Sequence, residues 1–166
     1  MVEVRDIQES DLEAAKSLTD TEKWGNSKSD WNRLFKKSIP LGAYDDGKLV
    51  GVTTAFNFST LGMIGNVIVS EDYRGKEIGR KLVIEAKRRL ETCDSVRVHS
   101  NMNSTVFYKK LGFTPEGMST LFRLDADLKE FQPFAIDSDD NIVPAEGYLD
   151  DILEMDKNGV IMAYRR

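Results

Sequence analysis

The sequence predicts an α/β domain, α+β-like in character, in which helices flank a mixed and mostly antiparallel sheet. Strand-like segments follow one another with only short turns between residues 41 and 69, which is typical of an antiparallel meander. A helical pattern then leads directly into another short strand, which predicts a crossover to a parallel neighbour. The 166 residues, 40% of them hydrophobic, suffice for one domain with a sizeable core.

The first quarter of the chain is expected to hold one short strand and two helices. Residues 2–5 alternate apolar and polar side chains, as a strand does. A helix is expected to start at Ser10, whose hydroxyl can accept hydrogen bonds from the free amides of a first turn. A polar loop over residues 19–28 precedes a second helix that begins near Ser29. Core anchoring is the expected role of the tryptophans in this part, Trp24 and Trp31, and lining a substrate site is the alternative.

The middle of the chain predicts three strands in antiparallel succession. Pro40 ends the helical region, and residues 41–44 and 49–58 flank an Asp-Gly turn that tolerates the positive φ of a tight hairpin. Ser59 and Thr60 turn the chain into a third strand over residues 61–69. This meander leads directly into residues 67–83.

That segment is a strand, a turn with glycines and the start of a long amphipathic helix. After Lys76, apolar residues recur at helical spacing, namely Ile78, Leu82, Val83, Ala86, Leu90 and Cys93. The free amides and the dipole of such a helix start favour a phosphate or pyrophosphate. An ordinary strand–turn–helix packing unit is the alternative.

The last elements are shorter. Residues 95–99 predict a strand, residues 100–104 a polar loop, residues 105–111 a helix stopped by Gly112, and residues 113–123 a broken strand. We expect the domain to cover residues 1–124. Residues 125–166 then form an acidic extension that packs on this domain or extends it.

Composition limits the classes of function. The net charge of −5 argues against nucleic acid as a partner, and no apolar run is long enough to span a membrane. The N-terminal segment lacks the apolar core of a secretory signal, so a cytoplasmic location is expected. The one cysteine, Cys93, is expected to be a buried structural thiol on the helix, and no metal site is expected.

Two motifs resemble those of the GNAT superfamily of N-acetyltransferases. The first matches the acetyl-CoA signature Gln/Arg-x-x-Gly-x-Gly/Ala and reads Arg74-Gly75-Lys76-Glu77-Ile78-Gly79. The second resembles the Tyr-x-Lys-x-Gly-Phe run of that family and reads Phe107-Tyr108-Lys109-Lys110-Leu111-Gly112-Phe113. The first signature glycine is replaced by Glu77, which places a carboxylate beside the expected pyrophosphate. The resemblance extends over residues 2–124 and implies the GNAT fold.

By this resemblance, the protein transfers an acetyl group from acetyl-CoA to a primary amine by direct attack. The expected acceptor is an amine-bearing small molecule, a polyamine or a protein amine, and the expected assembly is a monomer or homodimer. One alternative is a GNAT-like regulatory module that binds an acyl-CoA without turnover. Another is an interaction protein that uses only the fold.

The same resemblance assigns the cofactor site. Main-chain groups of the strand before the signature would align the pantetheine, and the signature loop would hold the pyrophosphate. The assigned residues are Val67, Ile68, Val69, Arg74, Gly75, Lys76, Glu77, Ile78, Gly79, Arg80, Asn101, Asn103 and Tyr108. Asn101 has the family's usual spacing from the tyrosine, and Asn103 is the alternative.

The catalytic assignment names one acid and several candidate bases. Tyr108 would protonate the leaving thiolate, unless it is only a packing residue. The strand over residues 61–69 contains no acid, so a water held by Asn66, or His99, would accept the proton of the amine. Two acids of the polar loop are further candidates, namely Asp20 and Glu22.

Overall fold

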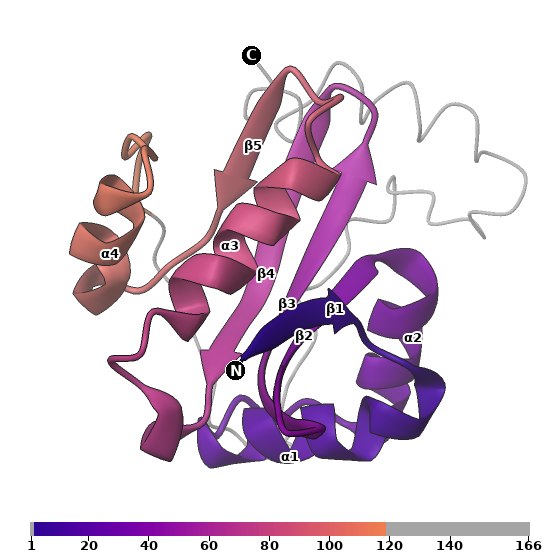
Figure 1. Ribbon diagram of the computed structural model, residues 1–166. Helices are drawn as coiled ribbons and strands as arrows, with labels where there is room; N and C mark the ends of the chain where they lie inside the picture. Colours follow the sequence, from indigo (N-terminus) through magenta and orange to yellow (C-terminus); the bar gives the residue numbers. More distant parts are fainter. Residues whose placement is uncertain (1, 119–166) are drawn as a thin grey trace, which may run out of the picture. The chain divides into compact units, whose positions relative to one another are not determined.

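The computed structural model describes residues 2–118 and contains five strands and four α-helices with short 3-10 turns (Figure 1). The strands are β1 (Glu3–Asp6), β2 (Ile39–Asp45), β3 (Lys48–Phe58), β4 (Leu61–Val69) and β5 (Ser95–Val98). The helices are α1 (Leu12–Thr21), α2 (Lys28–Lys37), α3 (Ile78–Arg89) and α4 (Thr105–Lys110). The 3-10 turns are η1 (Glu9–Asp11), η2 (Glu71–Tyr73) and η3 (Met102–Ser104). The expected boundary at residue 124 and the acidic extension lie outside the described residues.

The described strands form one sheet in the order β1-β2-β3-β4-β5. The pairs from β1 to β4 are antiparallel, whereas β4 and β5 are parallel and are joined by the crossover helix α3. The mixed, mostly antiparallel sheet predicted from the sequence is confirmed. The β2–β3 hairpin closes through Asp46 and Gly47, whose φ angles of 48° and 80° match the Asp-Gly signal of a tight turn.

Helices cover both faces of this sheet. One core cluster contains the buried face of α3, with Ile78, Leu82, Val83 and Ala86, as the helical spacing predicts. The other cluster joins α1 and α2 to Val52 and Ile68 of the sheet. Its centre is Trp31, which is fully buried and donates from its indole nitrogen to Thr19 Oγ1 over 3.1 Å. The core role expected of Trp31 is therefore confirmed. Among residues 2–118, no helix is long and apolar enough to cross a membrane.

Several element boundaries differ from the expectation. Ser10 lies in the turn η1, because Gln8 and Asp11 form a reciprocal cap there, and α1 begins at Leu12. Pro40 lies near the start of β2, where a missing amide is tolerated, so the strand begins earlier than predicted. Cys93 follows the end of α3 and is only partly buried. No strand forms over residues 113–118, the described part of the expected broken strand.

Two irregularities in β4 shape the region of the candidate site, namely a bulge and the end of its pairing with β5. Between the pairs Val52–Ile68 and Thr54–Gly65, β4 contains one residue more than β3, which makes a bulge. The bulge includes Asn66, whose φ of 51° lies in the left-handed region. The pairing of β4 with β5 ends at Ile64 and Val98. The two strands therefore separate beyond this point, and the described chain supplies no strand partner to residues 67–69 on that side.

Candidate active site

A cavity of about 250 Å³ lies where β4 and β5 separate, and we call it the β4–β5 cavity. The predicted site residues that line it are Asn66, Val67, Ile68, Val69, Arg74, His99, Asn101 and Tyr108. The remaining lining residues are Glu22, Trp24, Gly65, Val98, Ser100 and Ser104. The predicted residues Gly75 to Arg80, and Asn103, do not line this cavity. The fold thus brings the expected proton donor, Tyr108, and two candidates for accepting the amine proton, Asn66 and His99, to the wall of one cavity.

Tyr108 is held by aromatic neighbours of its own segment. Its ring meets those of Phe107 and Phe113 edge to face, with centroids 4.9 and 5.8 Å apart. The side chain is almost completely buried, and this burial raises the pKa of the phenol above its usual value. The hydroxyl therefore keeps its proton at neutral pH, which is the state that a proton donor needs.

Asn66 is fixed by the bulge and by one hydrogen bond. Its side-chain nitrogen donates to Thr54 Oγ1 of β3 over 3.0 Å. The neighbouring Thr53 hydroxyl donates to the carbonyl of Gly65 over 2.9 Å, which ties the backbone of the bulge to the same strand. The amide oxygen of Asn66 remains available as an acceptor for a water or an amine.

The candidate bases are separated by the structure. Glu22 lines the β4–β5 cavity and forms an ion pair with Arg74, whose Nε also donates to the carbonyl of Val69 over 3.1 Å. His99 lines the same cavity and is exposed. Asp20 instead bonds to Lys16 Nζ over 2.6 Å in α1 and does not line the cavity.

The signature loop has the backbone of an anion-binding turn. Gly75 and Glu77 have φ angles of 75° and 61°, and α3 begins directly after them. The first amides of α3 have no partner within the helix, so they can face a phosphate. A Cβ at Gly79 would lie 3.5 Å from the Phe107 ring and 3.7 Å from Val69, which are ordinary contacts, so a small side chain would fit here.

The charged side chains of this loop already have partners within the protein. Lys76 Nζ donates to the carbonyl of Asp72 over 3.0 Å and lies 4.8 Å from the centroid of the Tyr73 ring. The Arg80 guanidinium lies 3.7 Å from the carboxylate of Glu77, whose side chain is 70% exposed. The carboxylate of Glu77 therefore stands in solvent, and backbone amides are the main groups that the loop offers.

The two candidate asparagines have different places. Asn101 lines the β4–β5 cavity and caps η3, where its Oδ1 accepts from the amide and the hydroxyl of Ser104 over 3.0 and 2.9 Å. Asn103 lies within η3 and does not line the cavity. Of these two asparagines, Asn101 is therefore the one that borders the cavity.

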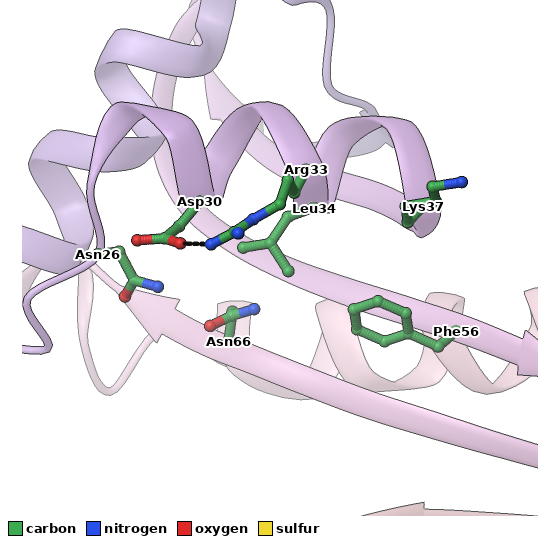
Figure 2. Close-up of a pocket in the computed structure, with 7 residues that line it drawn as sticks. All are labelled: Asn26, Asp30, Arg33, Leu34, Lys37, Phe56 and Asn66. Carbon is green, nitrogen blue, oxygen red and sulfur yellow. Dashed lines mark hydrogen bonds and ion pairs between the residues drawn. The ribbon is translucent and has the colours of Figure 1, made fainter. Parts of the chain in front are cut away.

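A second hollow, which we call the α2 groove, has a volume of about 290 Å³. Its seven lining residues are Asn26, Asp30, Arg33, Leu34, Lys37, Phe56 and Asn66 (Figure 2). Asn66 lines this groove as well as the β4–β5 cavity, so the bulge of β4 borders both hollows.

Sequence reasoning missed the α2 groove and the place of Trp24. Trp24 is 48% exposed and lines the β4–β5 cavity, so the expectation that it anchors the core is wrong. A usable signal existed for α2, because Asp30, Arg33 and Lys37 recur at helical spacing and so share one face.

Comparisons with known proteins agree with the fold of the described residues. A family model described as an acetyltransferase (GNAT) domain matches residues 36–115. Glucosamine-6-phosphate N-acetyltransferase from Arabidopsis thaliana is 19% identical with a TM-score of 0.62, and the match covers 75% of this chain and 99% of that chain. An acetyltransferase from Trypanosoma brucei is 25% identical with a TM-score of 0.61, over 75% of this chain and 100% of that chain.

A third solved structure contains a bound ligand. The aminoglycoside N-acetyltransferase AAC(6')-Iy, in complex with a CoA-containing bisubstrate analogue, is 16% identical with a TM-score of 0.62. This match covers 76% of this chain and 99% of that chain. At such identities these structures show a shared fold.

Proposed function

We propose that this chain, whose residues 36–115 match a family model described as an acetyltransferase (GNAT) domain, transfers an acetyl group from acetyl-CoA to a primary amine by direct attack. The observation that carries this proposal is that the side chain of Asn66 lines two separate hollows. Transfer between two substrates requires that the thioester and the amine approach one point from different sides. The bulge of β4 offers such a point.

The described residues fit acetyl-CoA. Beyond Ile64, the edge of β4 lacks a strand partner in the described chain, so the main-chain groups of Val67 and the amide of Val69 can bond the pantetheine amides like an added strand. The carbonyl of Val69 already accepts from Arg74 Nε. The left-handed turn at Gly75 and Glu77 directs the first amides of α3 at the place of a pyrophosphate. Both features lie along one continuous segment of the chain.

Each proposed catalytic step has a residue in place. The amine attacks the thioester carbonyl as a neutral nucleophile. The ammonium form therefore first loses a proton to a water held by Asn66, to His99 or to Glu22. The departing thiolate takes a proton, and Tyr108 is the buried donor that lines the β4–β5 cavity. These roles follow from position and chemistry, with the family resemblance as support.

The test begins with binding. Titration calorimetry of the full chain with acetyl-CoA and with CoA is expected to give saturable heat, and the absence of heat with both would refute the proposal. Release of CoA is then followed with a thiol reagent across a panel of primary amines, with a blank that accounts for the protein's own thiol, Cys93. Binding without amine-dependent release would instead favour the non-catalytic acyl-CoA-binding module.

A further inference from the structure

We propose that the acceptor is a primary monoamine with an apolar body, which lies along the α2 groove with its amine at Asn66. The inference rests on the proposed function and adds the class of the acceptor. The groove has chemically different ends, and its length runs beneath α2 (Figure 2).

One end of the groove is apolar. Phe56 of β3 lies beneath the C-terminal half of α2, and Leu34 points down from the helix toward the strands (Figure 2). The Phe56 ring also stacks in parallel on Phe58, with centroids 6.0 Å apart, which holds its orientation. An alkyl or aryl group placed here loses contact with water and gains contact with these side chains.

The other end is polar and close to neutral in net charge. Asn26, Asp30 and Asn66 gather beneath the start of α2, as Figure 2 shows. Asp30 accepts from the amide and the hydroxyl of Ser27 over 2.8 and 2.7 Å and forms an ion pair with Arg33. The bonds from Ser27, and then the one from Arg33, lower the pKa of this carboxyl to about 2, so Asp30 is ionised at neutral pH.

This charge balance suits the reacting amine. The positive charge of Arg33 compensates Asp30, so an amine at this end meets hydrogen-bond acceptors without a surplus of negative charge. A surplus would hold the amine as the ammonium ion, which cannot attack a carbonyl. The amide oxygens of Asn26 and Asn66 can accept from the neutral amine without raising its pKa as a free carboxylate would.

A second ammonium group has no matching site. Asp30 is the one carboxylate among the seven lining residues, and Lys37 lines the end at which the far terminus of a diamine would lie. The far ammonium would therefore leave water for an apolar surface beside a like charge. A polyamine, one of the acceptors considered from the sequence, fits this groove poorly.

The test compares hexylamine with 1,5-diaminopentane, which have the same number of heavy atoms and differ in one end group. We expect kcat/KM for hexylamine to exceed that for the diamine by about tenfold or more, because the charged end must be desolvated. Equal or better use of the diamine would overturn the inference. Thermal melting is the control that each substituted protein is folded.

Substitutions of lining residues test whether the groove causes the preference for hexylamine over the diamine. Phe56→Ala is expected to lower kcat/KM for hexylamine by about tenfold, whereas Phe56→Leu retains most of it. Lys37→Gln is expected to raise the ratio of kcat/KM for the diamine to kcat/KM for hexylamine several-fold, because it removes the like charge at the far end of the groove. The matched control is Lys36→Gln, because Lys36 lies in the same helical turn and does not line the groove. If Lys36→Gln and Lys37→Gln act alike, the groove does not select by charge.

A binding measurement separates the acceptor class from catalysis. In NMR titrations of the full chain with CoA present, hexylamine is expected to shift the amide signals of Leu34, Phe56 and Asn66 at lower concentration than the diamine does. If these shifts occur and hexylamine is not acetylated when acetyl-CoA replaces CoA, the acceptor class is supported and the proposed transfer is refuted. If hexylamine causes no shift at these residues, the inference fails even where another acceptor is acetylated.

Discussion

The side-chain nitrogen of Asn66 donates to Thr54 Oγ1 across the β3–β4 bulge over 3.0 Å. Thr54 is fully buried, whereas Asn66 reaches both the β4–β5 cavity and the α2 groove. A threonine without access to solvent therefore sets the direction of the one side chain that both hollows share. Thr54 acts as a positioning residue for the site.

Thr54→Val is expected to lower kcat/KM for acetyl transfer by about fivefold, since it removes a hydrogen bond worth roughly 1 kcal/mol and keeps the shape of the side chain. Steady-state kinetics with saturating acetyl-CoA measure this effect. Thr54→Ser restores the acceptor oxygen and is expected to recover most of the rate. A fully active valine variant would show that the orientation of Asn66 is irrelevant.

Tyr108→Phe is expected to reduce kcat by about 100-fold and to leave the melting temperature nearly unchanged, because the ring keeps its packing and only the proton donor is lost. Stopped assays of CoA release and thermal melting measure the two effects. In the wild-type protein, burial raises the pKa of the phenol above its usual value, so ionisation of this group should reduce kcat only at a higher pH than ionises a free phenol. Unchanged kcat in the variant would remove Tyr108 from the proposed mechanism.

The network of Glu85 and Arg89 links α3 to the first strand. Glu85 accepts from Arg88 Nη2 over 2.6 Å and from Arg89 Nε over 2.9 Å, and Arg89 also bonds to Asp6 of β1 over 2.5 Å. The bond from Arg88, and then that from Arg89, lowers the pKa of Glu85 to about 2. A lowered folded-state pKa means that the stabilisation exists above the unfolded-state pKa of about 4.3 and is lost as the pH falls toward 2.

Glu85→Gln is therefore expected to lower the free energy of unfolding by about 1 kcal/mol at pH 7, a figure reduced for the partial exposure of the pair. Urea titrations between about pH 7 and pH 2.5 should show the difference from wild type shrinking on the acid side. Glu91→Gln is the control, since Glu91 is exposed just beyond α3. A difference that grows in acid would contradict the role of Glu85.

The sequence predicted the elements that depend on local signals. The Asp-Gly hairpin formed because Asp46 and Gly47 accept positive φ, and α3 formed because its apolar residues recur on one side. The meander of β2, β3 and β4 and the crossover to a parallel β5 were expected from these elements, whereas no local pattern indicated that β1 pairs with β2. The two family-like motifs lay on the turn and the helix where they were expected.

The shape of the site was not predictable in this way. The bulge at Asn66 and the end of the β4–β5 pairing are set by register between strands, which no local pattern encodes. The α2 groove depends on how α2 lies over Phe56, and this requires tertiary packing. Trp24 was expected in the core because tryptophan side chains are usually buried. Its loop instead leaves it half exposed, where it lines the β4–β5 cavity.

Glu77 occupies a left-handed position that normally favours glycine, with φ of 61°. Glu77→Gly is expected to raise the free energy of unfolding by up to about 1 kcal/mol, because a side chain in this conformation is strained. It should also tighten acetyl-CoA binding about fivefold by removing a negative charge near the proposed pyrophosphate place. Calorimetry and urea titration measure both. Glu77→Gln removes the charge and keeps the strain, so it should change affinity without changing stability. If Glu77→Gly weakens binding, the side chain itself belongs to the cofactor site and the proposed role of the backbone amides is insufficient.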